Sequence, residues 1–438
     1  MKGKLYATAA LTIWFGALGT AQGQEQVYWA TPFDRAAKTE IEGSSGLSLV
    51  KVLNLVAVRN PILKSLDYRL EGSRQLVEQA GARINPELET EIEDVGWDAP
   101  GLKESEISIS LSQELEIFGQ PGARRRVASA DLEVTHFKTR LIAYDLFLET
   151  RRRFYTLAHA QEHYRLTTVS VALADSIAGN ISLRIEKGAA LASELALAQL
   201  ELQRVMLDQS EAEQELESAR VSLASLWHGD GSGLKVTILP EPESSDVLTG
   251  LPSIAAQIDS TRAVAMLIRQ GLLLETESDL AGIESRPAIT FRGGYKRVEA
   301  DNSNSFIFGV ALPLPLWNRN QGTRNSLLSE LRALDAEMQQ TRAETKKEID
   351  VGIFRLRQLF ERHTVLDEVL LPTAEEAYRT LLEAYRAGRL LYTSLLEAER
   401  SLNELRFEHN DMLLSIQNQI IALEQITGVT LNNYASEE

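Results

Sequence analysis

Two segments of this chain resemble each other at a separation of about 200 residues. The segment from Arg184 to Gly188 has its counterpart in Ala384 to Gly388, and Leu, Ala and Leu follow both glycines at identical offsets. Two further matches lie upstream: Ile107–Phe118 against Phe306–Trp317, and Asn85-Pro86 against Arg286-Pro287. Because two copies of one unit fold alike, the repeat predicts a duplicated architecture.

The matched positions divide the chain into comparable units. We predict a signal peptide at 1–23, a first repeat at 24–228, an irregular connection at 229–251, and a second repeat with a C-terminal tail at 252–438. Each repeat should begin with a helix, at 47–81 and 252–282. A pair of strands and then long helices should follow in both repeats.

The strands are predicted from apolar positions that alternate with polar ones, which is typical of a half-exposed strand. The alternating positions of the four strands are Leu88, Thr90 and Ile92; Ile107, Ile109 and Leu111; Ile289, Phe291 and Gly293; and Phe306, Phe308 and Val310. Pro313 and Pro315 should end the last strand, because proline cannot donate to a sheet ladder.

A very long helical pattern follows each strand pair. Residues 122–180 and 322–371 contain no proline. A helix of ~60 residues would be roughly 90 Å long, far beyond an ordinary globular helix. Gly188 and Gly388 then end the pattern, and apolar residues at alternating steps of three and four predict a coiled helix that runs back from each glycine.

The N-terminus predicts export from the cytoplasm. Lys2 and Lys4 precede a largely apolar run, and Ala21-Gln22-Gly23 fits the small-x-small pattern before a cleavage point. The chain has no Cys, which excludes disulfides and thiolate metal sites. Its formal net charge of −17 argues against a nucleic-acid partner, which would need a basic surface.

The predicted elements are incomplete in one chain. Two hairpins supply four strands whose outer edges must be covered by other subunits. Only helices and closed barrels satisfy every backbone group in lipid. Several copies in a ring would close the strands into a membrane barrel, and the long helices would continue that barrel into the periplasm.

On these grounds the chain resembles the TolC family of outer-membrane efflux proteins over nearly its whole mature length. The strings that carry the resemblance are Asn60-Pro61, Gln79-Ala-Gly81, Asn85-Pro-Glu-Leu88, Leu111-Ser-Gln-Glu-Leu-Glu116 with Gly119, and Leu312-Pro-Leu-Pro-Leu-Trp-Asn-Arg-Asn-Gln-Gly322. The last string makes the chain most similar to the heavy-metal branch, the outer-membrane component of cobalt-zinc-cadmium type resistance systems.

The resemblance implies a mainly α fold with a membrane β-barrel in the outer membrane of a Gram-negative bacterium. The assembly would be a homotrimer with four strands per protomer in a twelve-stranded barrel and a periplasmic α-helical tunnel. Implied partners are outer-membrane lipid, a periplasmic adaptor (membrane fusion) protein and an inner-membrane, proton-driven pump of the resistance-nodulation-division type. The implied function is a passive exit duct for heavy-metal cations, without a cofactor.

In the family, the helices turn at a periplasmic tip that meets the adaptor. Gly188 and Gly388 occupy these turns here, where glycine relieves the backbone at a reversal. The neighbouring candidate adaptor contacts are Arg184, Ser193, Arg386, Arg389 and Thr393. The alternative is an ordinary helix-hairpin turn with solvated charges.

The best-studied member of the family constricts its tip with a pair of aspartates in the second repeat. The matching positions here are Ser394 and Glu397, so one carboxylate is missing, while Glu194 occupies the Ser394 position in the first repeat. Rings of carboxylates favour cations in a pore. We expect Glu397, together with Glu194, to form an acidic ring near the closed tip; the alternative is a solvated helix face.

His159 and His163 share one helix face, as metal ligands can. No third ligand is near in sequence, and a channel needs weak binding in order to release its cargo. We therefore interpret the pair as surface residues. Two arginine runs, 124–126 and 151–153, are interpreted as partners of the many glutamates, with phospholipid headgroups as the alternative partner of the first run.

The sequence contains no phosphate-binding Gly-rich loop, no Gly-x-Ser-x-Gly and no His-Glu-x-x-His. We therefore do not expect an enzyme, and energy for transport must come from a partner. Two alternatives stay open: a channel for drugs or other small molecules, and a periplasmic adaptor or coiled-coil scaffold without a barrel. The string ending in Trp317 favours metals, and the two strand pairs count against an adaptor.

Overall fold

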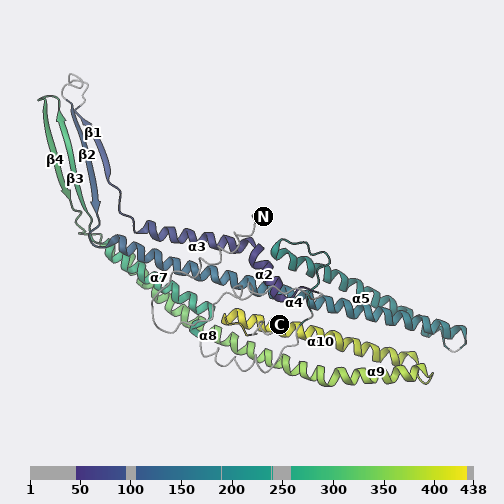
Figure 1. The fold of residues 1–438 in the computed structure, drawn as a ribbon. Helices are drawn as coiled ribbons and strands as arrows, with labels where there is room; N and C mark the ends of the chain where they lie inside the picture. Colours follow the sequence, from purple (N-terminus) through teal and green to yellow (C-terminus); the bar gives the residue numbers. More distant parts are fainter. Residues whose placement is uncertain (1–45, 95–104, 189, 238, 240–257, 432–438) are drawn as a thin grey trace. The chain divides into compact units, whose positions relative to one another are not determined.

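The computed structural model describes residues 46–94, 105–188, 190–237, 239 and 258–431. The predicted signal peptide and most of the predicted connection 229–251 lie outside the described residues. Within the described part, four strands form one sheet, and long helices begin beside one end of that sheet (Figure 1).

The four strands form an antiparallel sheet in the order β1-β2-β3-β4. Their bounds are Glu87–Glu93 (β1), Glu106–Leu115 (β2), Ile289–Val298 (β3) and Ser303–Ala311 (β4). Both predicted hairpins are confirmed, and pairing of β2 with β3 joins them although they are far apart in the sequence. The strands β1 and β4 are the two edges of the sheet.

The register places the alternating apolar positions of all four strands on one face. Leu88 pairs with Leu111, Leu111 with Gly293, and Gly293 with Phe308, so these positions form a row across the sheet. Large side chains on this face are open to the surroundings, with Phe308 85% and Leu88 70% exposed. An apolar face of this extent is typical of a surface that meets lipid or another protein.

The N-terminal segment forms two helices, so the expected single helix over 47–81 is wrong. Helix α2 covers Leu49–Arg59 and α3 covers Pro61–Ala80, with Asn60 extended between them. Proline disfavours a helical residue before it. Asn60 also caps α3, because its side-chain oxygen accepts a hydrogen bond from the Ile62 N–H at 2.9 Å.

Each hairpin continues into a very long helix, as predicted. Helix α4 spans Gln120–Glu186 and is about 100 Å long at 1.5 Å per residue. The other described helices are α5 (Ala192–Ala224), α7 (Arg262–Glu284), α8 (Gln321–Val365), α9 (Leu371–Arg386), α10 (Tyr392–Thr427) and the short 3-10 turns η3 (Ser225–Trp227) and η4 (Ile258–Ser260).

The second long helix changes its winding before it turns. Residues Leu366–Leu370 form a π-helical turn, η5, between α8 and α9. Pro372 is the second residue after this turn, and a proline has no N–H for the carbonyl one turn earlier. The sequence pattern predicted an uninterrupted helix over 322–371, so the widened turn is a departure from that pattern.

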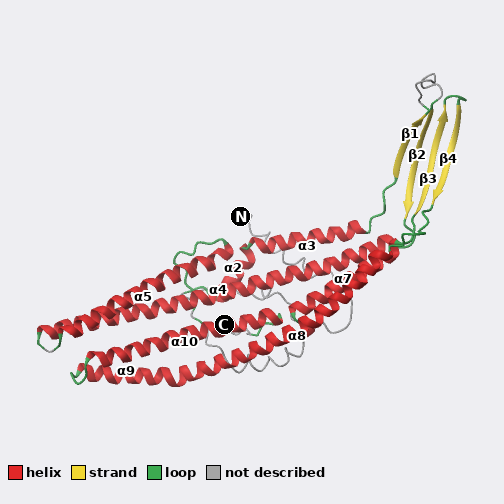
Figure 2. Ribbon diagram, turned by 180° about the vertical axis from the view of Figure 1, so that it is seen from behind, coloured by secondary structure: helices red, strands yellow, loops and turns green. Residues whose placement is uncertain are grey.

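The helices pack in antiparallel pairs. Helix α5 lies along α4, and α10 lies along α8 and α9, in both views of the chain (Figures 1 and 2). One buried apolar cluster joins α8 to α10 through residues that include Leu356, Phe360, Ile416 and Ile420. A second cluster, near the helix turns, includes Ile181, Ala198, Tyr385, Tyr392 and Leu395. The coiled-coil seams predicted from the sequence therefore supply much of the core.

In the described part, α4 contains one 18-residue window that is apolar enough to cross a membrane, with a mean hydropathy of 1.3. A helix of a packed bundle meets the same criterion. Because α4 packs against α3, α5, α7 and α10, we assign its apolar residues to the bundle.

Candidate functional site

The two helix turns share one backbone conformation. Gly188 has φ +70° and Gly388 has φ +68°, which is the left-handed region that glycine adopts without strain. The N–H of Gly188 donates to the Ile185 carbonyl at 2.8 Å, and the N–H of Gly388 donates to the Tyr385 carbonyl at 2.9 Å. These bonds satisfy carbonyls at the ends of α4 and α9, so both predicted reversals are positioned by glycine.

An aromatic contact joins the two turns. The Arg184 guanidinium lies over the Tyr385 ring at 5.0 Å from its centre, which links α4 to α9. Burial raises the pKa of the Tyr385 hydroxyl; Arg184 acts to lower it and Glu194 to raise it. Arg184, predicted as an adaptor contact, and Glu194, predicted at the constriction, therefore both act on one tyrosine.

The remaining predicted contacts at the turns are open to solvent. Ser193, Arg386, Arg389 and Thr393 are all exposed. No ion pair joins Arg386 or Arg389 to a carboxylate among the described residues. Two unneutralised guanidinium groups thus flank Gly388 and are free to bind an acidic surface.

The predicted constriction residues do not form one cluster within the chain. Glu397 lines a groove of about 520 Å³ that is walled by residues of α4, α5 and α10. The charged residues of this groove are Glu201, Arg204, Asp208, Glu397, Arg400 and Glu404. Glu194 and Ser394 are half-buried and are not among the residues that line it. A ring of Glu397 side chains would need the other subunits.

A network of buried charged residues lies beside this groove and was not predicted from the sequence. Arg400 on α10 forms an ion pair with Glu201 on α5. Glu399 is only 5% exposed, and burial, reinforced by the charge of Glu201, raises its pKa to about 7. The sequence signal was available, since Glu399 lies four residues after the apolar Leu395, on the side of α10 that the seam predicts to be buried.

The histidine pair acts as a link between helices. The ring centres of His159 and His163 are 6.0 Å apart on α4. His159 Nε2 lies 2.6 Å from Asp411 Oδ1 on α10, and His163 Nδ1 lies 3.2 Å from Glu215 Oε2 on α5. Among the described residues no group of three or more His, Cys, Asp or Glu is placed to hold a metal ion.

The face of the sheet opposite the apolar one is polar and acidic. Residues of this face, which we call the acidic face, include Glu87, Glu89, Glu91, Glu93, Glu106, Ser108, Ser110, Ser112, Glu114, Thr290, Arg292 and Lys296. These charged residues occupy the positions between the apolar residues from which the strands were predicted, and they were not singled out from the sequence.

The basic residues of the acidic face neutralise only part of it. Arg292 pairs with Glu89, and Lys296 pairs with Glu106 and approaches Glu93 at 3.9 Å. Glu87, Glu91 and Glu114 have no ion pair among the described residues. On β4 the same face carries Ser303, Ser305, Ile307, Gly309 and Ala311, with no cation. The sheet thus separates an apolar surface from a negatively charged one.

A sequence profile of the outer membrane efflux protein family matches residues 52–229 and 253–429. This chain belongs to that family. The cobalt-zinc-cadmium resistance protein CzcC of Cupriavidus metallidurans is 27% identical over 398 residues, which are 88% of this chain and 91% of that protein. The nickel-cobalt-cadmium resistance protein NccC of Alcaligenes xylosoxydans xylosoxydans is 22% identical over 270 residues, 61% of this chain and 60% of that protein.

Solved structures of efflux channels share the fold. CusC superposes with a TM-score of 0.71 at 16% identity, covering 89% of this chain and 95% of CusC. VceC from Vibrio cholerae gives a TM-score of 0.69 at 16% identity, covering 88% of this chain and 97% of VceC. The expected TolC-like fold is confirmed: this chain has the long helices and a four-stranded antiparallel sheet, and the solved structures that it resembles are channels of the same fold.

Membership of this family indicates what surrounds the two faces of the sheet. Outer membrane efflux proteins work as trimeric outer-membrane channels in tripartite efflux systems and extend into the periplasm. In the closed barrel of such a channel, the apolar face of the strands meets lipid and the polar face lines the water-filled interior. An adaptor or scaffold without a barrel, the third interpretation of the sequence, does not agree with this membership.

Proposed function

We propose that this outer membrane efflux protein is an exit duct for heavy-metal cations. The acidic face carries the proposal: six glutamates against two basic residues leave it with an excess of negative charge in every protomer. Fixed negative charge along a pore raises the local concentration of cations and repels anions. The relatives CzcC and NccC bear the names of metal-resistance proteins.

The acidic face stays unbalanced when the sheet closes. In a closed trimer, edge strand β1 of one protomer meets edge strand β4 of the next. Because β4 offers no basic side chain on this face, Glu87 and Glu91 gain no cationic partner there. Same-face residues are about 6.8 Å apart along a strand, closer than the Debye length of about 8 Å at physiological salt, so neighbouring charges act together.

In this proposal the duct is a homotrimer and is one part of a three-protein path. An inner-membrane, proton-driven pump of the resistance-nodulation-division type would deliver the cation, and a periplasmic adaptor would dock at the helix turns. The adaptor contacts would be Arg184, Gly188, Ser193, Arg386, Gly388, Arg389 and Thr393, and Glu194, Ser394 and Glu397 would narrow the closed end. Each repeat, 24–228 and 252–438, would contribute one helix turn.

Purified trimer in a planar bilayer tests the duct and its charge preference together. With a tenfold KCl gradient, the reversal potential should show that K⁺ passes in preference to Cl⁻. A deletion strain should become sensitive to zinc, cobalt or cadmium salts and regain resistance with the wild-type gene. A bilayer without channels, or a strain sensitive to drugs and detergents but not to metal salts, would contradict the proposal.

A further inference from the structure

The connections between the sheet and the helices carry exposed apolar side chains in both repeats. In the first repeat, Ile117 is 57% and Phe118 40% exposed, directly after β2. In the second repeat, the residues after β4 that are exposed to a similar or greater degree are Leu312, Leu314, Leu316 and Trp317. These residues lie beyond the last strand pairings, in the loops that join β2 to α4 and β4 to α8 (Figure 2).

The second connection needs few hydrogen-bond partners, as a surface against lipid requires. Pro313 and Pro315 have no N–H, and the Leu316 N–H donates to the Leu314 carbonyl at 2.9 Å. The Pro315 carbonyl accepts from Arg319 Nε at 3.2 Å, and the Trp317 carbonyl accepts from Gln321 Nε2 at 3.1 Å. The carbonyls of Leu314, Pro315 and Trp317 thus have hydrogen-bond donors within the connection itself, and the two prolines have no N–H that needs an acceptor.

Exposed arginines gather at the same level, although the chain as a whole is acidic. Arg125 and Arg126 lie in the first turns of α4; Arg319 lies just before α8, and Arg324 lies in the first turn of α8. All four are exposed, and no ion pair joins any of them to a carboxylate in the described part of the chain. Arg124, by contrast, is neutralised by a two-pronged pair with Glu116.

Side-chain bonds between the connections hold the two groups at one level. Gln120 Nε2, at the start of α4, donates to the Arg286 carbonyl before β3 at 3.3 Å. Asn320 Nδ2, just before α8, donates to the Ala281 carbonyl of α7 at 3.1 Å. The Arg286 guanidinium also lies 5.8 Å from the centre of the Phe118 ring. The apolar residues and the arginines of both repeats therefore share one end of the sheet.

We infer that these residues form a collar that binds anionic glycerophospholipid of the periplasmic leaflet. The collar consists of Ile117, Phe118, Leu314, Leu316, Trp317, Arg125, Arg126, Arg319 and Arg324. Its apolar and aromatic side chains lie at the edge of the hydrocarbon, where tryptophan is favoured, and its guanidinium groups bind the lipid phosphates. The collar fixes how deeply the trimer sits in the membrane, and this role is independent of the cargo.

Lipid titration of the purified full-length trimer tests the collar. Native mass spectrometry counts the phosphatidylglycerol molecules retained by wild type, by Arg125→Gln/Arg126→Gln and by Arg319→Gln/Arg324→Gln. Each double variant should bind the lipid roughly tenfold more weakly, because each basic residue near a membrane surface contributes to the attraction for anionic lipid. The matched control is Arg355→Gln/Arg357→Gln on α8, where both arginines are exposed and unpaired in the described chain, and it should bind as wild type does.

The depth of Trp317 gives a second, independent readout. Lipids brominated near the headgroup should quench wild-type fluorescence more than they quench Trp317→Phe, and lipids brominated at the acyl terminus should not. Equal lipid binding by wild type and both collar variants, an equal loss in the control, or no shallow quenching of Trp317 would overturn the inference. Channel conductance of the same variants should stay unchanged, so failure of the collar is distinguishable from failure of the duct.

Discussion

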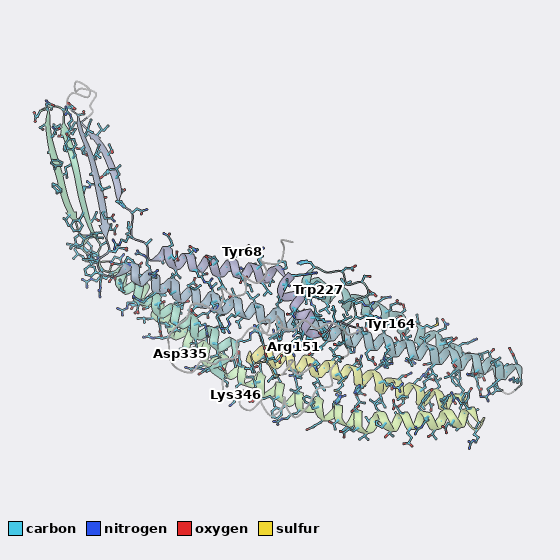
Figure 3. All side chains as sticks on the ribbon, in the orientation of Figure 1. Tyr68, Arg151, Tyr164, Trp227, Asp335 and Lys346 are labelled. Atoms are coloured by element: carbon cyan, nitrogen blue, oxygen red, sulfur yellow. The ribbon has the colours of Figure 1, made fainter. Side chains whose placement is uncertain are left out.

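Arg151 and Glu424 form an ion pair in which neither side chain is exposed to solvent. Arg151 lies in the middle of α4 (Figure 3). Glu424 lies in the last turn of α10. Glu424 Oε1 also accepts a hydrogen bond from the Leu431 N–H at 2.7 Å. This pair joins the last turn of α10 to the middle of α4, and it confirms the expectation that arginines of the 151–153 run pair with glutamate.

Removing one partner of this pair should be strongly destabilising. Arg151→Leu leaves Glu424 as an unpaired buried charge, so we expect a loss of about 3–5 kcal/mol in the free energy of unfolding. The double variant Arg151→Leu/Glu424→Leu should recover much of that loss. Urea unfolding of the purified protein measures both.

The matched control for the buried pair is exposed. Arg362 and Glu408 form an ion pair with 57% and 48% of their side chains exposed, and Arg362→Leu should cost less than about 1 kcal/mol. A single Arg151 variant that unfolds like this control would show that the burial of the pair has little energetic consequence.

Substitution at the second helix turn should act through the backbone alone. Gly388 has φ +68°, and a Cβ added there would meet no atom within 4 Å. Gly388→Ala should therefore cost about 1–2 kcal/mol from the left-handed conformation, and Gly388→Asn should cost less. Gly322→Ala, at an open helical position without positive φ, should be neutral or stabilising in the same thermal melts. Equal melting temperatures for the two alanine variants would contradict this reading of the turn.

The elements that the sequence predicted best depend on local periodicity. The alternation in Leu88, Thr90 and Ile92 and the steps of three and four after Gly388 are dictated by which face of a single element is buried. The pairing of β2 with β3, and of Arg151 with Glu424, joins residues far apart in the chain. No local pattern encodes such partners, so they could not be read from the sequence.

Two interruptions of the helices were not predicted, because the apolar periodicity continues through both of them. Asn60-Pro61 lies inside an apolar pattern that continues on both sides, yet proline and a capping side chain divide the helix there. The π turn at 366–370 likewise leaves the apolar spacing nearly intact. The glutamates of the strands were not predicted as functional for a different reason. A strand is recognised by its alternating apolar residues, and the polar residues between them add nothing to that recognition.

The stability of the helix pairs near the groove should depend on pH through Glu399. Burial raises the pKa of this carboxyl to about 7, whereas in the unfolded chain it returns to about 4.3. Between these values the folded protein holds a proton that the unfolded chain has lost. Stability contributed by the protonated form is therefore full below about pH 4 and is lost as pH rises toward 7.

Glu399→Gln removes this titration and keeps the shape of the side chain. Thermal melts at pH 5, 6, 7 and 8 should show wild type losing about 2 kcal/mol more than the variant across this range. Glu397→Gln, two residues earlier and exposed, should retain the wild-type profile. If the stability of wild type and Glu399→Gln depends on pH in the same way, the prediction is wrong. The charged form of Glu399 would then be better solvated than its burial indicates.

Charge selectivity should reside in the acidic face of the sheet as well as at the helix turns. Glu87→Gln/Glu91→Gln removes two charges that have no ion pair among the described residues, and it keeps the strand polar. In planar bilayers the ratio of K⁺ to Cl⁻ permeability should fall by at least about twofold, because the pore loses six fixed charges per trimer. Glu71→Gln/Glu78→Gln, at exposed positions of α3, should leave the ratio unchanged.

Glu397→Gln distinguishes the two possible locations of the charge selectivity. If Glu397→Gln lowers the permeability ratio and Glu87→Gln/Glu91→Gln does not, the selectivity resides at the helix turns. The glutamates of β1 would then serve only to keep an edge strand from pairing with unrelated chains.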